Sequence, residues 1–163
     1  MSRLFAVGSL LFVGVALRDQ SIAVKGRLTC GAKPAADVLV KLWDEDIVIS
    51  AKFYCFHLTD VNPFSWLDPH DLLDLNHSNS NGEFQLAGAT TEFTAMEPVL
   101  SVYHDCNDGI KSGVRKLSIG LPDQYITAGR TPLKTVDIGI INLELSYKKE
   151  ERVDDDEEEI LTK

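Results

Sequence analysis

The segment that decides the fold is SIAVKGRLTCGAKPAADVLVKLW, Ser21 to Trp43. On each side of a central turn, its apolar residues recur at every second position. Ile22, Val24, Gly26 and Leu28 alternate with Ala23, Lys25 and Arg27; further on, Val38, Val40 and Leu42 alternate with Leu39, Lys41 and Trp43. A period of two is that of a strand with one buried face, and Gly31 to Pro34 supply the turn. The segment therefore predicts two half-buried β-strands.

The same pattern continues along the chain. Further strands are expected at 84–86, 98–104, 116–121, 135–138 and 141–146, separated by turn signals such as Asn81-Gly82 and Asn107-Asp108-Gly109. No run resembles a β-α-β unit, and neither standard glycine-rich phosphate loop is present. About seven short strands with regular turns predict an all-β, Greek-key β-sandwich.

Length and composition limit the class of protein. The chain has 163 residues, which favours one domain, and it is 44% hydrophobic and 25% charged, as globular proteins are. The net charge of −9 is the wrong sign for a dedicated nucleic-acid binder, so no nucleic-acid partner is expected.

The amino end has the pattern of a secretory signal. Met1-Ser2-Arg3 precedes LFAVGSLLFVGVAL, an uncharged run that is shorter than the roughly 20 apolar residues of a membrane span. Small residues at Gly14 and Ala16 predict cleavage between Ala16 and Leu17. A buried first strand or helix is the alternative. We expect a signal peptide at 1–16, a secreted extracellular protein and no transmembrane anchor.

The remaining chain divides into a sandwich at 17–147 and an acidic, disordered tail at 148–163, which contains EERVDDDEEE. Within the sandwich, residues 47–66 (IVISAKFYCFHLTDVNPFSW) form an atypical aromatic insertion that interrupts an acidic stretch. Two interpretations stand: a real loop that contacts a partner, or a retained intron translated in frame, which the abrupt change of composition favours.

Three cysteines raise the question of pairing, because disulfides persist in secreted proteins. Cys30 and Cys106 adjoin predicted strands, and a bridge between them would leave Cys55 as the odd thiol. Such a bridge would close a loop of about 77 residues, for which chain entropy predicts about 4.5 kcal/mol of stabilisation. Unpaired, buried thiols are the alternative.

Four motifs resemble the nematode transthyretin-like family. They are AVKGRLTCGAKPAADVLVKLWDED, DLLDLNHSNSNGEFQLAG, YHDCNDGI and TPLKTVDIGIINLE, and they occur in the family's order. The resemblance covers about Ser21 to Leu145, apart from the insertion. It implies a secreted transthyretin-like sandwich with a disulfide between Cys30 and Cys106. The family's frequent second cysteine pair is missing here at both positions.

The resemblance also bears on catalysis. The transthyretin fold includes 5-hydroxyisourate hydrolase, whose family ends its last strand in Tyr-Arg-Gly-Ser, whereas this chain reads NLELSYKKEE. Cys106 of His104-Asp105-Cys106 cannot be a nucleophile if it is bridged, and His104 is expected to face inward. No catalytic residue and no cofactor are therefore expected.

Two features suggest binding or modification. Lys25, Arg27 and Lys41 lie on the polar faces of the first two predicted strands. If the two strands share a sheet, the three cations form a patch that could recognise an anionic headgroup or an acidic partner. The alternative is that they are ordinary solvated surface residues. Asn76-His77-Ser78 is an N-glycosylation sequon. The carboxylates around Asp44 and Asp71 lack EF-hand spacing and are read as a solvated loop, so no metal is expected.

These observations favour a secreted, non-enzymatic binding or adaptor protein that recognises an extracellular protein or lipid ligand at cell surfaces. A role as adaptor is also what the resemblance implies, since some members of the family are thought to act at cell surfaces. The alternative is a carrier of a small hydrophobic ligand, and a hydrolase is the least favoured function. An oligomer is compatible with the sequence.

Overall fold

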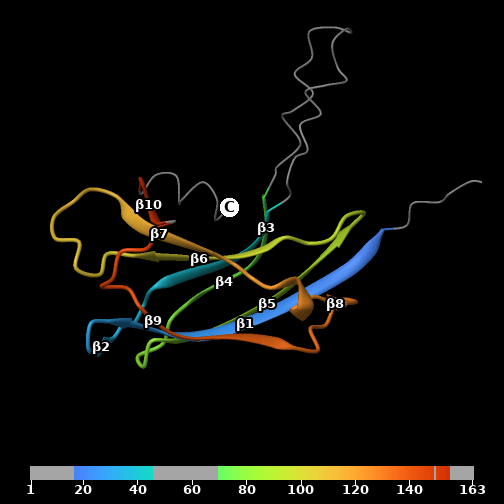
Figure 1. Cartoon of the computed structure of the whole chain (residues 1–163), viewed down its shortest axis with the longest axis horizontal. Helices are drawn as coiled ribbons and strands as arrows, with labels where there is room; N and C mark the ends of the chain where they lie inside the picture. Colours follow the sequence, from blue (N-terminus) through green and yellow to red (C-terminus); the bar gives the residue numbers. More distant parts are fainter. Residues whose placement is uncertain (1–16, 46–69, 149, 155–163) are drawn as a thin grey trace, which may run out of the picture.

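A computed structural model describes residues 17–45, 70–148 and 150–154 as a sandwich of two β-sheets (Figure 1). Sheet A contains β1 (Arg18–Cys30), β2 (Lys33–Pro34), β5 (Glu83–Glu92), β8 (Thr127–Ala128) and β9 (Thr135–Asn142). Sheet B contains β3 (Leu39–Glu45), β4 (His70–His77), β6 (Pro98–His104), β7 (Val114–Gly120) and β10 (Glu150–Val153). The only helical turn of the described residues is η2 (Asp123–Tyr125). The predicted all-β sandwich is confirmed.

The long strand β1 is the centre of sheet A. It runs antiparallel to β5, from Arg18 opposite Glu92 to Arg27 opposite Glu83, and its other edge pairs in parallel with β9 and antiparallel with β8. Sheet B has the order β10-β7-β6-β3-β4, with antiparallel pairing throughout. The first two predicted strands, β1 and β3, therefore lie in opposite layers.

The core lies between the layers and is filled by the alternate apolar residues that the sequence pattern singles out. Ile22, Val24 and Leu28 of β1 are fully buried, and so are Val40 and Leu42 of β3 and Leu100 and Val102 of β6. Phe84, Leu86, Met96, Leu117, Leu121, Val136 and Leu143 complete the buried cluster. Burying each such side chain contributes on the order of 1.5–3 kcal/mol, so these strands associate through their inner faces.

The chain crosses from sheet B to sheet A in the turn between β4 and β5. Asn79 shapes this turn, since its side-chain Oδ1 accepts hydrogen bonds from the backbone N–H groups of Asn81 and Glu83, each at 2.9 Å. Gly82 has a positive φ of 77°, and a Cβ atom there would collide with the carbonyl oxygen of Leu28. The predicted Asn81-Gly82 turn is thus confirmed, and it fixes the end of β5 against β1.

Besides the two-residue strands β2 and β8, two longer strands were not expected from the sequence. The carboxylates that were read as a solvated loop lie in strands: Asp44 is fully buried in β3, and Asp71 and Asp74 belong to the edge strand β4. Glu150–Val153 of the predicted disordered tail forms β10. β4 runs antiparallel to β3, with His77 opposite Leu39 at one end and His70 opposite Glu45 at the other. β10 pairs with β7, whose basic residues form ion pairs with the acidic residues of β10. In addition, β9 ends at Asn142, so the strand predicted at 141–146 continues only to that residue.

Several expectations fall outside the described residues: the signal peptide at 1–16 with its cleavage after Ala16, the insertion at 47–66 with Cys55, and the tail from 155 to 163. Across the described part of the chain, no helix has the length and hydropathy that crossing a membrane requires.

Candidate functional site: a groove on sheet A

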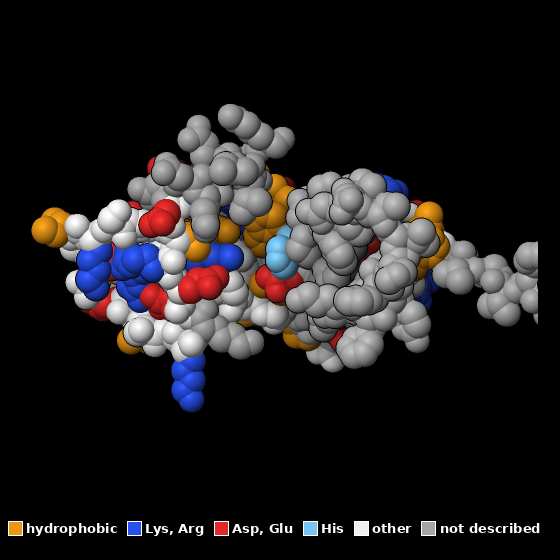
Figure 2. All heavy atoms as spheres, turned by 90° about the horizontal axis from the view of Figure 1, so that it is seen from above, with side chains coloured by type: hydrophobic (Ala, Val, Ile, Leu, Met, Phe, Trp, Pro, Cys, Tyr) orange, Lys and Arg blue, Asp and Glu red, His pale blue; other side chains and the backbone are white. Residues whose placement is uncertain are grey.

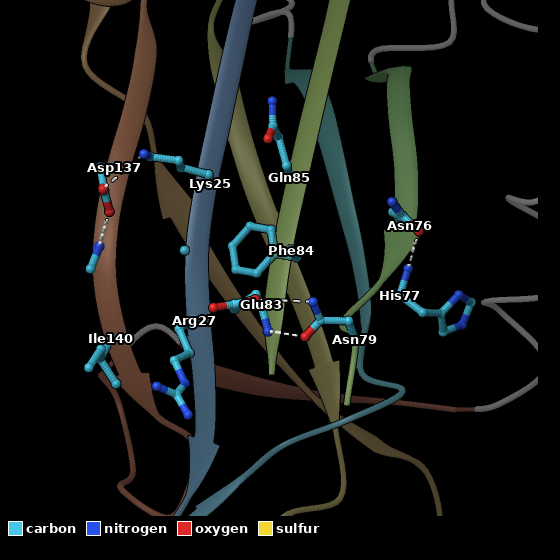
Figure 3. Close-up of a pocket in the computed structure, with 12 residues that line it drawn as sticks. Lys25, Arg27, Asn76, His77, Asn79, Glu83, Phe84, Gln85, Asp137 and Ile140 are labelled. Carbon is cyan, nitrogen blue, oxygen red and sulfur yellow. Dashed lines mark hydrogen bonds and ion pairs between the residues drawn. The ribbon is translucent and has the colours of Figure 1, made fainter. Parts of the chain in front are cut away.

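A groove of about 750 Å³ runs across the outer face of sheet A to the end of β4 (Figure 3). Both β1 cations of the predicted patch, Lys25 and Arg27, line it. Its other lining residues are Gly26, Asn76, His77, Asn79, Glu83, Phe84, Gln85, Asp137, Gly139 and Ile140. Lys25 and Asp137 lie at one side of the groove and Asn76 at the other. Four strands and one turn therefore build a single surface.

Lys25 and Arg27 both point outward because alternate residues of a strand face the same side, and Gly26 between them lies on the inner side of β1. A Cβ atom on Gly26 would lie 2.5 Å from Cγ1 of Ile138 and 3.2 Å from Cε1 of Phe84, so these two side chains occupy the space that a larger residue would need. The absence of a side chain at Gly26 therefore leaves this space to Ile138 of β9 and Phe84 of β5.

A β-bulge in β9 brings a hydrophobic residue to the groove. The β1–β9 register shifts between Lys25 and Arg27, so that Lys25 lies opposite Asp137 and Arg27 opposite Ile140. Gly139, with a φ of 70°, is the extra residue of this bulge. Ile140 is consequently 68% exposed, whereas Ile141 packs against the core.

The charges in the groove are only partly compensated. Lys25 Nζ lies 3.5 Å from Asp137 Oδ2, and both side chains are more than half exposed, so water weakens this ion pair. The backbone N–H of Gly139 and, secondarily, Lys25 lower the pKa of Asp137, which keeps the carboxylate ionised. Arg27 donates its Nε–H to the carbonyl of Asn81 at 2.9 Å, while its two terminal nitrogens make no hydrogen bond with the described residues. Arg27 thus presents an open guanidinium fork to solvent.

Lys41 does not belong to this surface, and its inclusion in the predicted patch is wrong. Because β3 lies in sheet B, Lys41 is on the opposite side of the sandwich from Lys25. Lys41 is fully buried, with Nζ 5.0 Å from the ring centroid of Tyr103 and 5.7 Å from that of Trp43. Such distances are those of cation–π contacts.

The sequon residue Asn76 ends up on the same groove. It lies near the end of the edge strand β4 and is exposed, and its Oδ1 accepts a hydrogen bond from the backbone N–H of His77 at 2.8 Å. Among residues 17–45, 70–148 and 150–154, no three His, Cys, Asp or Glu side chains are placed so as to hold a metal ion.

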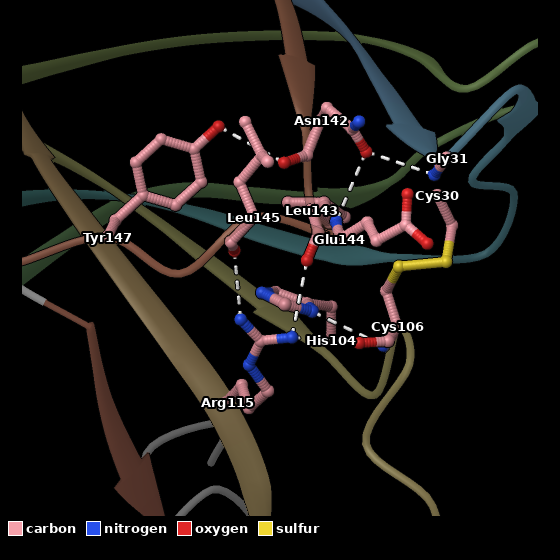
Figure 4. The surroundings of a disulfide bond; sticks show 10 residues. All are labelled: Cys30, Gly31, His104, Cys106, Arg115, Asn142, Leu143, Glu144, Leu145 and Tyr147. Atoms are coloured by element: carbon pink, nitrogen blue, oxygen red, sulfur yellow. Dashed lines mark hydrogen bonds between the residues drawn. A yellow bond between two sulfur atoms is a disulfide. The ribbon is translucent and has the colours of Figure 1, made fainter.

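The disulfide joins the two sheets at one end of the sandwich (Figure 4). It connects Cys30, the last residue of β1, to Cys106, which follows β6, and both are partly buried beside the core. The bridge implied by the resemblance is therefore present. Because its sulfur is bonded, Cys106 cannot act as a thiolate nucleophile.

His104 lies beside this bridge and faces inward, as expected. It is only 5% exposed, and its Nδ1 accepts a hydrogen bond from the backbone N–H of Cys106 at 3.3 Å, while Nε2 has no partner among the described residues. Burial and, secondarily, the positive charge of Arg115 lower the pKa of His104, although Glu150, Asp105 and Asp108 act in the opposite direction. The folded chain therefore favours the neutral imidazole.

This arrangement predicts a loss of stability in mild acid. Since the pKa of His104 is lower in the folded than in the unfolded chain, the unfolded chain binds more protons below about pH 6.5. The stability that the neutral imidazole supports is present above that pH and is lost as the pH falls through the folded pKa. The melting temperature should fall between pH 7.5 and 5.5, and His104→Gln should flatten this dependence. The exposed His77 provides the control, and an equal flattening by His77→Gln would contradict the assignment.

Charged residues also hold β10 on β7, at the far side of the molecule from the groove. Lys116 pairs with Glu151 at 3.4 Å, Arg152 with Asp108 at 2.6 Å, and Arg115 with Glu150. Figure 2, which views this side of the molecule, shows basic and acidic side chains interleaved there. These cations have acidic partners within the chain, whereas Arg27 has none among the described residues, and so the groove on sheet A offers the more available positive charge.

The fold and the groove define a disulfide-bonded β-sandwich whose outer face has an open guanidinium. Residues 25–122 match the model of the transthyretin-like family, and the chain belongs to that family. It is 48% identical over 154 residues to transthyretin-like protein 46 of Caenorhabditis elegans, which covers 93% of this chain and 76% of the relative. It is 40% identical over 133 residues to transthyretin-like protein 5 of the same organism, covering 82% of this chain and 83% of the relative.

A 9R-lipoxygenase from Cyanothece superposes with a TM-score of 0.35 at 14% identity, over 86% of this chain and 18% of the lipoxygenase.

Proposed function

We propose that this chain is a secreted, non-enzymatic binding protein that docks the groove of sheet A on anionic lipid headgroups at cell surfaces. The observation that carries the proposal is the side chain of Arg27, whose Nε–H is held by the carbonyl of Asn81 and whose two terminal nitrogens make no hydrogen bond within the described part of the chain. Lys25 lies on the same face, and the exposed Ile140 is opposite Arg27 on β9.

The chemistry of this surface suits a membrane interface. A guanidinium fork binds a phosphate through two parallel hydrogen bonds, and the ion pair of Lys25 with Asp137 is exposed enough to be exchanged for a ligand. Ile140 offers an apolar contact beneath the headgroups. The chain as a whole carries a net charge of −9, so attraction to an anionic membrane must be local, within a Debye length of about 8 Å.

Secretion and the lack of enzymatic activity are part of the same proposal. The amino-terminal pattern of the sequence supports export, and a disulfide agrees with an oxidising compartment. The sequence NLELSYKKEE in place of Tyr-Arg-Gly-Ser, and the bonded sulfur of Cys106, argue against a hydrolase. We also propose that Asn76 is glycosylated, because it is exposed and lies in a sequon.

Neutralising both cations of the groove should release the protein from anionic membranes. Each basic residue near such a surface contributes about 1 kcal/mol, so Lys25→Gln with Arg27→Gln should weaken binding by about 2 kcal/mol, or roughly thirtyfold. The measurement is sedimentation with vesicles of equal parts phosphatidylcholine and phosphatidylglycerol, at low and physiological salt.

The control removes the same charge elsewhere. Lys33 and Lys148 are exposed and do not line the groove, and their joint replacement by glutamine should leave most of the affinity. Equal losses in the two double variants would show that only net charge matters and would refute the groove as the docking surface.

A second candidate function is a carrier of a small apolar ligand. It is favoured by a cleft of about 470 Å³ beside the disulfide, whose lining includes Pro34, Val38, Leu39 and Leu143. An apolar fluorescent probe that binds stoichiometrically to the native protein, in a manner unaffected by Lys25→Gln with Arg27→Gln, would favour the carrier over the adaptor.

Secretion is tested by the intact mass of the native protein before and after reduction and alkylation. A chain that begins at Leu17 and contains one bridge supports it, whereas an uncleaved chain with three free thiols would overturn it. The same mass decides whether residues 47–66 are present in the mature protein.

A further inference from the structure

The sequon lies where a glycan would face the proposed docking surface. Asn76 and His77 are exposed and line the groove on the side away from Lys25. The Nδ2 atom of Asn76, to which an N-linked glycan attaches, makes no hydrogen bond with the described residues, while Oδ1 is held by the backbone N–H of His77. A glycan can therefore be accommodated at Asn76 without breaking an interaction of the fold.

Ser78, the third residue of the sequon, is buried, whereas Asn76 is exposed. Ser78 is only 5% exposed, its hydroxyl donates a hydrogen bond to the carbonyl of Ala35 at 2.7 Å, and the same oxygen accepts one from the N–H of Val38 at 2.9 Å. Its backbone also exchanges hydrogen bonds with Asp37 and Val38. An enzyme that must reach both Asn76 and the Ser78 hydroxyl finds the sequon closed once β3 and β4 have paired.

We infer that a glycan is added to Asn76 before the sandwich closes and that it then restricts the groove of sheet A to small anions. The second part rests on the proposed function, since it concerns the same groove. A flat membrane must approach the whole rim from β9 to β4, and a bulky, hydrated glycan at Asn76 keeps it away. A free phosphate ion needs only the space around Lys25 and Arg27. Occupancy of Asn76 thus sets which form of the protein docks on membranes.

The test uses the full chain, secreted from a eukaryotic host that builds high-mannose glycans. Endoglycosidase treatment trims the glycan to one sugar on the same polypeptide, and Asn76→Gln from the same host removes the glycan. Binding is measured to phosphatidylglycerol vesicles and to inorganic phosphate, and the intact mass gives the occupancy. Asn76→Gln should keep the fold, because glutamine is polar and the position is exposed.

The inference predicts a glycan in the intact mass, at least about a tenfold gain in vesicle binding on trimming, the same gain in Asn76→Gln, and unchanged phosphate binding. A wild-type chain without a glycan overturns the inference, and so does equal vesicle binding by the trimmed and untrimmed forms. In the latter case the proposed function survives, because vesicles are still bound. If no form binds vesicles or phosphate, the proposed function itself fails.

The order of events has its own readout. Purified oligosaccharyltransferase with a lipid-linked donor should modify the reduced, unfolded chain at Asn76 and leave the folded, unglycosylated chain unmodified. Equal modification of the folded and unfolded chains would contradict the closure of the sequon by Ser78.

Discussion

Replacing Cys30 and Cys106 together by alanine is expected to lower the free energy of unfolding by about 4 kcal/mol. The bridge joins residues 76 positions apart, and constraining so long a loop removes much of the entropy of the unfolded chain. It also joins the end of β1 in sheet A to the end of β6 in sheet B, two strands with no backbone pairing between them. The measurement is equilibrium unfolding in urea, monitored by fluorescence and circular dichroism.

Reduction provides the matched control. In the presence of a strong reductant, the wild-type chain should approach the stability of the double alanine variant, because both then lack the bridge. A difference between oxidised wild type and variant of less than about 1 kcal/mol, well under the usual 2–5 kcal/mol, would contradict the role given to this disulfide.

The second large effect is expected at Arg115. Its Nη1 donates to the carbonyls of Cys106 at 2.8 Å and Leu143 at 3.2 Å, its Nη2 donates to that of Leu145 at 3.0 Å, and its Nε binds the carboxylate of Glu150. One side chain therefore connects the disulfide loop, the turn after β9 and the start of β10. Both members of the ion pair are largely shielded from water, with side chains 11% and 9% exposed, so Arg115→Met leaves a shielded carboxylate without its partner.

Loss of one partner of a buried ion pair costs about 3–5 kcal/mol, and this is the destabilisation expected for Arg115→Met. The matched control is Arg130→Met, which breaks the exposed pair of Arg130 with Asp19 and should cost at most about 1 kcal/mol. Replacing Glu150 by methionine as well should restore part of the stability. If Arg115→Met and Arg130→Met lower the free energy of unfolding equally, the contacts of Arg115 do not stabilise this end of the molecule more than an exposed ion pair does.

The pH dependence of the same pair has a defined sign. Arg115, followed by the backbone N–H of Tyr147, lowers the pKa of Glu150 below its usual range. The stability from the ionised carboxylate is therefore fully present above the unfolded pKa of about 4.3 and is lost as the pH falls through the folded value. Acid should destabilise the wild type more than the variant in which both residues are methionine.

Much of the sandwich follows from local pattern, and the exceptions have physical causes. The apolar alternation of β1, β3 and β7 marks the face that meets the core. The prediction of half-buried strands is nevertheless wrong for β3, which is buried on both faces, as is β6. β4 could not be recognised in this way, since it is an edge strand whose residues are at most half-buried and whose partner β3 lies beyond the insertion. β10 has an acidic sequence that predicts disorder, but it pairs with β7, where Arg115 and Lys116 form ion pairs with its carboxylates.

The candidate site could be predicted in part. Lys25 and Arg27 share a face because they are two positions apart on one strand, but the placement of Lys41 depended on which sheet β3 joins, which no local pattern specifies. Asn76 and Ile140 reach the groove through tertiary structure. The one signal for Ile140 was Gly139 inside an otherwise regular strand, since such a glycine often marks a bulge that turns the next side chain to the other face.

The most direct test of the central claim is an NMR titration of the mature chain with glycerophosphoglycerol, the soluble headgroup of phosphatidylglycerol. If the groove on sheet A binds this headgroup, the largest shifts will occur at the Nε–H of Arg27 and at the backbone amides of Lys25 and Gly139. Shifts that centre on Lys116 and Arg152, on the opposite side of the molecule, or the absence of saturable shifts at Arg27, would contradict the account.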